Sequence, residues 1–170
     1  HALCVGVQAL ALRKVGNNSP IVKALMEARQ RGKQVTAVVE LKARFDEERN
    51  INWAEEMERQ GVNVVYGFVG LKVHAKLCLV IRKEASGIRS YVHIGTGNYN
   101  PGSAKNYTDL GLLTSAQDIC SDVTDLFNVM TGYAVRDNYR RLFVSPTCMR
   151  SGIERADRKS VVKGKSVGHG

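Results

Sequence analysis

The segment from Leu71 to Val80 places a histidine between two lysines at alternate positions. Lys72, His74 and Lys76 would share one face of an extended strand, and mainly apolar residues would share the other. Two nearby ammonium groups disfavour the imidazolium form, so the ring would stay neutral near pH 7. They would also attract a phosphoryl group that a neutral ring nitrogen can attack. The pattern indicates phosphoryl-transfer chemistry, but a solvated strand face with an incidental histidine has the same alternation.

A second polar motif is the turn Gly95-Thr96-Gly97-Asn98, which His93 precedes. Two glycines, a hydroxyl and an amide can direct hydrogen-bond donors at an anion, although such a sequence is also typical of ordinary turns. We interpret His93 as a structural, hydrogen-bonding histidine rather than a second catalytic one.

The two motifs are predicted to meet because they lie on the two arms of a hairpin. Two extended runs, 73–82 and 89–95, are joined by the polar turn 83–87. An antiparallel hairpin returns the end of its second strand to the start of its first, where His74 lies.

Further elements must hold this hairpin, and their order predicts an α/β fold with a mixed sheet flanked by helices. Ser19 and Pro20 form a helix start, with serine as N-cap and proline in the first turn. The predicted strands cover 2–12, 34–41, 62–66 and 107–114, and the predicted helices cover 20–31, 46–60 and 116–130.

Composition favours one globular domain of ordinary character, since the chain has 170 residues, 44% of them hydrophobic, and a net charge of +9. No apolar run is long enough to span a membrane. The four cysteines are scattered without a CxxC pair, which argues against a zinc site and favours reduced thiols in the cytoplasm. The first residue is not methionine, so we expect an internal piece of a longer protein.

The charge is concentrated at the end of the chain, where residues 136–170 hold nine basic and three acidic side chains. We divide the chain into a catalytic domain over 1–133, the start of a second domain over 134–150, and a basic tail over 151–170. A strand is predicted over 139–145. The tail shows no regular period and is expected to be disordered or not native; a nucleic-acid-binding arm is the alternative.

His-x-Lys followed by a Gly-x-Gly-Asn turn resembles the signature of the phospholipase D superfamily. Five longer strings in the same order are similar to the polyphosphate kinase family, and the resemblance covers about residues 10–147. These strings are NSPIVKAL at 18–25, VELKARFDEE at 39–48, GLKVHAKL at 70–77, YVHIGTGNYNP at 91–101 and YTDLGLLT at 107–114. The resemblance implies a phospholipase D-like fold and the first of two catalytic domains.

The resemblance also implies roles for single residues. His74 matches the histidine that accepts the γ-phosphate of ATP as phosphohistidine and passes it to polyphosphate. Arg44 matches an arginine associated with the phosphates and their magnesium. Lys76 and Asn98 match phosphate-binding positions, and Tyr107 matches a tyrosine at the nucleotide. Asp109 would share the strand face of Tyr107, where it could orient a site residue or be a plain strand-edge carboxylate.

Three departures from the family pattern limit this assignment. A second family arginine falls on Lys14, next to Arg13, and a lysine lacks the bidentate fork of a guanidinium. The acidic residue of the superfamily signature is replaced by Ile81. The other half of the family's active site, including a second histidine, is not in this chain, so the fragment is expected to have low activity.

The implied function is reversible transfer of the γ-phosphate of ATP to inorganic polyphosphate, which leaves ADP. The implied cofactor is Mg²⁺. The implied partners are the missing second catalytic domain and, for the full-length enzyme, further copies of itself; no specific nucleic acid is expected. The implied location is the cytoplasm, with possible peripheral membrane association of the full-length enzyme. Two alternatives remain: a phospholipase D-type phosphodiesterase or nuclease built from two copies of the motif, and a non-catalytic module that binds polyphosphate or nucleic acid.

Overall fold

The computed structural model describes residues 6–12, 19–40, 47–68 and 70–164. The strands in this part of the chain are β1 (Gly6–Leu12), β2 (Val35–Val39), β3 (Asn63–Tyr66), β4 (Lys76–Glu84), β5 (Gly87–Gly95) and β6 (Gly111–Thr114). The helices are α1 (Pro20–Gln30), α2 (Glu47–Arg59), α3 (Pro101–Ala104), α4 (Gln117–Met130) and α5 (Met149–Gly164).

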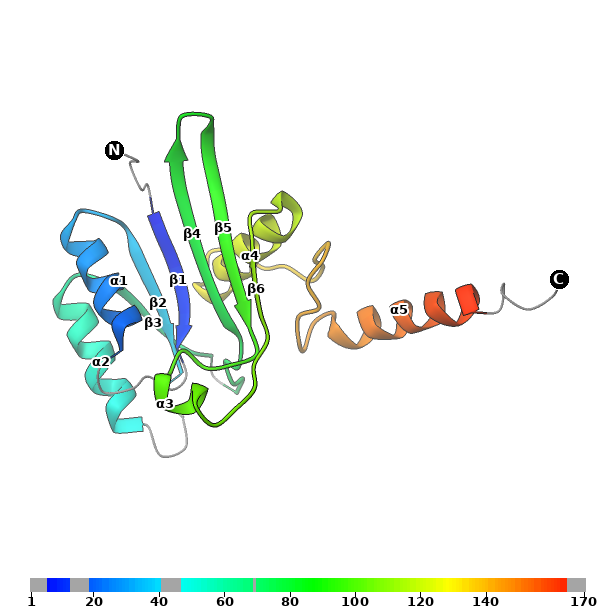
Figure 1. The fold of residues 1–170 in the computed structure, drawn as a ribbon, viewed down its shortest axis with the longest axis horizontal. Helices are drawn as coiled ribbons and strands as arrows, with labels where there is room; N and C mark the ends of the chain where they lie inside the picture. The colour runs from blue at the N-terminus through cyan, green and yellow to red at the C-terminus, as the bar shows by residue number, and fades with distance from the viewer. Residues whose placement is uncertain (1–5, 13–18, 41–46, 69, 165–170) are drawn as a thin grey trace.

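All six strands form one sheet in the order β3-β2-β1-β4-β5-β6 (Figure 1). The strands β1, β2 and β3 are parallel, whereas β4, β5 and β6 each run antiparallel to the strand before them in that order. The sheet is therefore mixed, as predicted. The carboxyl ends of β1, β2 and β3 share one edge with the start of β4 and the end of β5.

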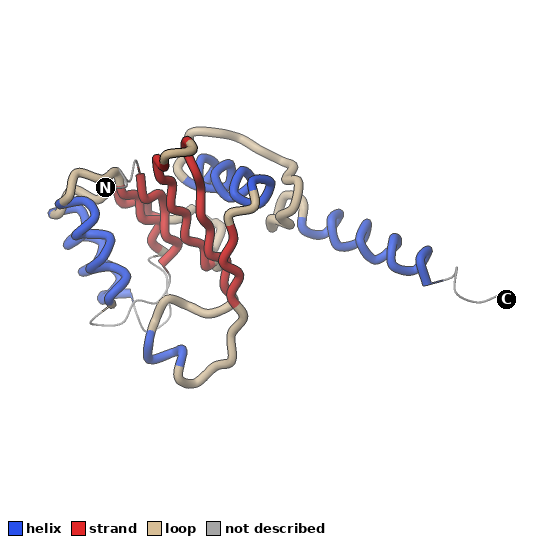
Figure 2. The backbone as a smooth tube through the Cα atoms, turned by 45° about the horizontal axis from the view of Figure 1, so that its top comes forward, coloured by secondary structure: helices blue, strands red, loops and turns tan. Residues whose placement is uncertain are grey.

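Helices cover both faces of the sheet, which places two hydrophobic cores around it (Figure 2). On one face, α1 and α2 pack against β2 through buried side chains that include Val22, Met57 and Ala37. On the other face, α4 packs against β4 and β5, with Phe127 and Leu79 among the buried side chains. The described core side chains of β2 and β4 are thus removed from water, some on one face and some on the other.

The helix boundaries follow from local signals that the sequence predicted. Ser19 is the N-cap of α1, its Oγ accepts a hydrogen bond from the amide of Val22 at 3.4 Å, and Pro20 begins the first turn. α1 and α4 differ from the predicted ranges by one residue at most at each end. Among the described residues no helix is both long and apolar enough to cross a membrane.

Two predicted strands begin later than expected. β4 starts at Lys76 rather than near Val73, so the segment 72–75 lies outside the sheet and the predicted alternation of its faces is wrong. Lys76 and Leu77 are both buried, whereas His74 is exposed. β6 starts at Gly111, so the preceding residues, predicted as strand, form a loop.

The segment after α4 also differs from prediction. Residues 139–145 form turns and bends in place of the predicted strand. The segment is held on α4 by the buried carboxylate of Asp122, whose Oδ2 accepts hydrogen bonds from the amides of Arg141 at 2.6 Å and Leu142 at 3.1 Å. The expectation of an irregular tail is wrong up to Gly164, because α5 covers this stretch and extends away from the sheet (Figure 1). That the tail is not native to the domain stays a prediction.

Candidate functional site

The edge of the sheet at the carboxyl ends of its parallel strands gathers the polar motifs. Ligands of open α/β sheets bind at such edges because loops from several strands meet there. The register pairs Lys76 of β4 with Gly95 of β5, which confirms the predicted hairpin. His74 and the turn after Gly95 consequently line one cavity.

His74 and Lys76 both line this cavity and lie next to each other. The Lys76 side chain is only 4% exposed, and its Nζ donates a hydrogen bond to the His74 carbonyl oxygen at 2.6 Å. The same Nζ lies 3.2 Å from Nδ1 and 3.3 Å from Nε2 of the His74 ring, so it favours neither nitrogen. A buried cation thus lies beside an exposed imidazole, an arrangement suited to an anionic group approaching the ring.

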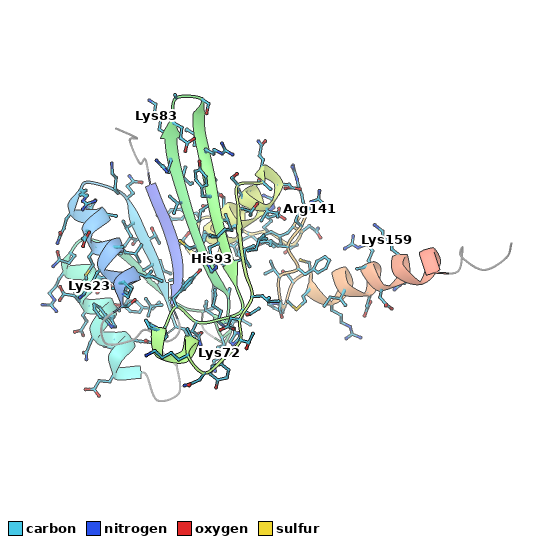
Figure 3. The ribbon with its side chains drawn as sticks, in the orientation of Figure 1. Lys23, Lys72, Lys83, His93, Arg141 and Lys159 are labelled. Carbon is cyan, nitrogen blue, oxygen red and sulfur yellow. The ribbon has the colours of Figure 1, made fainter. Side chains whose placement is uncertain are left out.

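The predicted lysine partner on the other side is not in the cavity. Lys72 is exposed and is not among the described residues that line the cavity. Figure 3 shows Lys72 at the same end of the sheet as α3, and Lys83 at the opposite tip of the hairpin. Only one of the two predicted flanking cations, Lys76, therefore contacts His74.

The cavity has a volume of about 540 Å³, and the residues that line it are polar side chains and glycines. Its lining residues are His74, Lys76, Thr96, Gly97, Asn98, Asn100, Gly102, Ser103, Asn106, Tyr107 and Asp109. The sequence prediction did not single out Asn100, Ser103 or Asn106. Asn100 followed by proline is a helix-start signal that would have predicted α3, whose first amides bond to the Asn100 side chain at 2.8 and 3.2 Å.

The turn after β5 is closed by hydrogen bonds from Thr96. Its amide donates to the carbonyl of Leu110 at 3.0 Å, while its Oγ accepts from the Leu110 amide at 2.9 Å and donates to Asp109 Oδ1 at 3.0 Å. The amide of Asn100 is bonded within the loop to Asn98. These two backbone donors are therefore engaged within the loop.

Two cavity residues are poised to contact a ligand. Asn98 Oδ1 is buried without a hydrogen-bond partner among the described residues, and an unsatisfied buried acceptor costs about 1–3 kcal/mol. Tyr107 is 72% exposed, so its ring is available for stacking. Tyr107 and Asp109 both line the cavity although they lie in a loop rather than on the predicted strand. Arg44 and Lys14 lie outside the described residues.

His93 lies beside the cavity and holds the turn. Its Nδ1 is 2.7 Å from the hydroxyl of Tyr99. Burial raises the pKa of Tyr99, so the phenol keeps its proton near neutral pH and can donate to Nδ1. The ring is accommodated by two glycines, because a Cβ would lie 3.0 Å from the ring at Gly95 and 2.9 Å at Gly111. The structural interpretation of His93 agrees with these contacts.

A glycine in the turn makes room for the carboxylate of Asp109. A Cβ at Gly97 would overlap that carboxylate and lie 3.0 Å from the Asp109 Cβ. We expect Gly97→Ala to lower the free energy of unfolding by about 1–3 kcal/mol, because the Asp109 side chain, which accepts a hydrogen bond from Thr96, must move to relieve the overlap. Urea denaturation measures the change.

Two further variants control this prediction. Gly102→Ala should have a smaller effect, since its Cβ would meet nothing closer than 3.2 Å. The double variant Gly97→Ala/Asp109→Ala should recover most of the lost stability, because the overlapping carboxylate is gone. Equal destabilisation with and without the Asp109 substitution would contradict the explanation.

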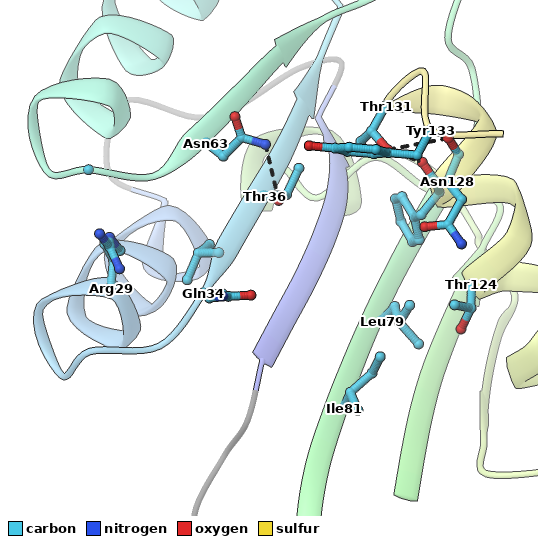
Figure 4. Close-up of a pocket in the computed structure, with 13 residues that line it drawn as sticks. Arg29, Gln34, Thr36, Asn63, Leu79, Ile81, Thr124, Asn128, Thr131 and Tyr133 are labelled. Atoms are coloured by element: carbon cyan, nitrogen blue, oxygen red, sulfur yellow. Dashed lines mark hydrogen bonds between the residues drawn. The ribbon is translucent and has the colours of Figure 1, made fainter. Parts of the chain in front are cut away.

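A second cavity, of about 570 Å³, lies between β2, β3 and the carboxyl end of α4 (Figure 4). Its described lining includes the pair Asn63–Thr36, bonded at 3.4 Å, and the ring of Tyr133. No histidine, cysteine, lysine or acidic side chain is among the described residues that line it. The first cavity is therefore the better candidate for chemistry.

Comparison with known proteins gives one consistent family. The model "Polyphosphate kinase C-terminal domain 1" matches residues 5–136. Polyphosphate kinase of Mycolicibacterium gilvum is 58% identical over 149 residues, covering 87% of this chain and 20% of the relative. Polyphosphate kinase of Synechocystis is 57% identical over 141 residues, covering 83% of this chain and 19% of the relative. The chain spans about a fifth of the length of these relatives.

Solved structures agree with the fold. The crystal structure of polyphosphate kinase from Porphyromonas gingivalis matches 96% of this chain with a TM-score of 0.81 and 36% identity, covering 27% of that protein. NucT from Helicobacter pylori matches 76% of this chain and 80% of its own, with a TM-score of 0.51 and 14% identity. The second likeness concerns the fold alone.

Proposed function

Because the chain belongs to the polyphosphate kinase family, we propose that its cavity directs the γ-phosphate of ATP to His74, in the first half of a reversible transfer to polyphosphate. One observation carries the proposal: the buried Nζ of Lys76 lies within 3.3 Å of both nitrogens of an exposed imidazole. The cation would draw the phosphoryl group towards the nucleophile and neutralise part of its charge.

In the proposed step a neutral ring nitrogen of His74 attacks the γ-phosphorus. The bond from phosphorus to the bridging oxygen breaks, and ADP leaves with the electron pair. The phosphohistidine then passes its phosphoryl group to a terminal oxygen of a polyphosphate chain, and the ring nitrogen recovers its electron pair. Each step is reversible, so the same residues would serve polyphosphate synthesis and ATP formation.

The other cavity residues would bind the substrate. Asn98 would contact a phosphate, through its amide nitrogen after a rotation that exchanges oxygen and nitrogen. Tyr107 would stack on the nucleotide. Arg44 and Lys14 keep their proposed phosphate roles by resemblance. Mg²⁺ would arrive as part of the substrate, bound by the ATP phosphates.

The rest of the enzyme is also part of the proposal. Since the chain spans about a fifth of its relatives, we assign 1–133 to the first catalytic domain, 134–150 to the start of the second, and 151–170 to the tail. The missing second domain would complete the active site, so this chain alone would have low activity. Homo-oligomerisation of the complete enzyme and a cytoplasmic location with possible peripheral membrane association complete the proposal.

The test is incubation of the purified chain with γ-labelled ATP and Mg²⁺. The proposal predicts label on the protein that is labile in acid and stable in base, as expected of a phosphoramidate. Subsequent addition of polyphosphate should remove this label, and subsequent addition of ADP should return it as ATP. Absence of label from a folded chain would reject transfer by this half-site, and addition of the second domain in trans would then test whether that domain is required.

The same preparation distinguishes the two rival functions. Hydrolysis of a phosphodiester in the presence of EDTA would favour the phosphodiesterase. Polyphosphate binding that survives loss of His74 and weakens steeply with salt, without label, would favour the non-catalytic module.

A further inference from the structure

The loop that carries His74 is held at both ends, by the last residue of β2, Val39, and by the next residue, Glu40. The amide of Gly67 donates to the carbonyl oxygen of Val39 at 3.1 Å, where the chain leaves β3. Phe68 and Leu71 then form an isolated antiparallel bridge. The chain returns to the segment after β2 at Val73, the residue before His74, which bonds to Glu40.

The contact that holds the loop at Val73 is made by a side chain, not by backbone pairing between strands. Oε2 of Glu40 accepts a hydrogen bond from the amide of Val73 at 2.8 Å. Glu40 is only 6% exposed and Val73 only 7%, so water cannot readily replace this contact. Asn50 of α2 fixes Glu40 in turn, since its Nδ2 donates to the Glu40 carbonyl oxygen at 2.9 Å.

The backbone of His74 is therefore held on both sides, through the residue before it and through its own carbonyl group. Val73 is fixed by its buried side chain in the α4-side core and by the Glu40 carboxylate. The carbonyl of His74 is fixed by Lys76. The imidazole itself stays exposed, which leaves the ring accessible while its backbone is restrained.

We propose that Glu40 is a positioning residue for His74: its buried carboxylate sets the backbone of the nucleophile against the phosphate cavity. The expected effect on the rate of phosphoryl transfer rests on the proposed function. The expected effect on the loop rests only on the contact between Glu40 and Val73. A misplacement of about 1 Å in a reacting group can reduce a rate about 100-fold, so loss of the contact should slow phosphoryl transfer without removing any group that touches the substrate.

Two substitutions of Glu40 separate its hydrogen bond from its charge. Glu40→Gln keeps an oxygen that can accept from Val73 and should transfer phosphate within about threefold of wild type. Glu40→Ala removes the acceptor and should slow the labelling of His74 by about 10- to 100-fold, with the ATP concentration for half-maximal rate changed by less than about twofold. Amide hydrogen exchange of Val73 should become at least about tenfold faster in Glu40→Ala alone.

Two controls exclude a general loss of stability. Val22→Ala creates a cavity in the core on the α1 side, which does not include Val73, and should leave Val73 exchange and the labelling rate near wild type while the chain stays folded. Glu58→Ala removes an exposed carboxylate that bonds the Tyr66 hydroxyl and should behave likewise. Slowing by either control equal to that of Glu40→Ala would overturn the positioning role.

The two readouts fail independently of each other. If Val73 exchanges equally fast in wild type and Glu40→Ala, the positioning role is wrong whatever the label shows. If Val73 exchange rises in Glu40→Ala while labelling continues at the wild-type rate, the role is also wrong. If the wild-type chain takes up no label, the proposed function fails for this half-site, and the exchange of Val73 still decides whether Glu40 holds the loop.

Discussion

The His74→Ala variant is expected to take up less than about 1% of the label that the wild-type chain takes up from γ-labelled ATP. The substitution removes the only group that the proposed step uses as nucleophile, so no phosphoramidate can form there. His74 is exposed, and its loss should change the free energy of unfolding by less than about 0.5 kcal/mol. Quantification of acid-labile label together with urea denaturation separates the chemical effect from a folding effect.

Added imidazole provides a sharper form of the same prediction. Alanine at position 74 leaves a space in the lining of the cavity, beside the Nζ of Lys76. Imidazole that enters this space should accept the phosphoryl group there and then dissociate as phosphoimidazole. ATP is then consumed without labelling of the protein. Rescue should be absent from wild type, where the ring fills the site.

One result would count against His74 as the nucleophile. Label on His74→Ala at the wild-type level would assign the phosphoryl group to another residue. His93 would then be the first alternative to test, although its Nδ1 is already bonded to Tyr99 and its ring lies against Gly95 and Gly111.

The parts of the fold that the sequence predicted well depend on local signals. Ser19 and Pro20 fix the start of α1 through a cap and a restricted φ, and both act on their immediate neighbours. The hairpin of β4 and β5 has an unbroken register from Lys76–Gly95 to Glu84–Gly87. Such pairing follows from a short connection, and for this reason the meeting of His74 with the Gly-Thr-Gly-Asn turn was predictable.

The prediction of a strand at 72–75 is wrong because the hydrogen-bond partner of this segment is a side chain distant in the sequence and not a neighbouring strand. Residues 72–75 alternate in polarity as a strand would, yet the sheet offers them no partner, since the β1–β4 pairing reaches only Cys78. The amide of Val73 bonds to the Glu40 side chain instead. A contact between residues 33 positions apart leaves no periodic trace, so neither the exclusion of Lys72 nor the role of Glu40 could be read from the pattern.

The error at the end of the chain has a different cause. The prediction for residues 151–170 rests on their lack of an apolar period, but the helix α5 has charge pairs at helical spacing. Glu154 lies 3.0 Å from Arg150 and 4.0 Å from Arg158. Pairs at i and i+4 favour a helix by a few tenths of a kcal/mol each, a signal that apolar periodicity does not contain.

Lys76→Met is expected to lower the rate of His74 labelling by about 100- to 1000-fold, the range found when one charged or polar group that stabilises a transition state is removed. Methionine matches the length of the lysine stem but has neither a charge nor a donor. The ammonium group contacts both the His74 carbonyl and the His74 ring, so its loss affects the position and the electrostatics of the nucleophile together. Rapid-quench labelling at saturating ATP measures the rate.

Lys76→Arg distinguishes charge from shape. The guanidinium keeps the positive charge but is planar and bulkier than an ammonium. Lys76 is only 4% exposed, so the larger group has little room. We expect a partial recovery, to within about 10- to 100-fold of wild type. Equal rates for Lys76→Arg and Lys76→Met would mean that the exact place of Nζ, rather than the positive charge, controls the transfer.

Lys83→Met is the matched control, because it removes the same charge from the same strand. Lys83 is exposed at the tip of the β4–β5 hairpin, at the end of the sheet opposite Lys72 (Figure 3). Screening makes an exposed charge at that distance nearly irrelevant to the cavity, so the labelling rate should stay within about twofold of wild type. A comparable loss in Lys83→Met would attribute the effect to the net charge of the domain, and the contact between Lys76 and His74 would then lose its assigned role.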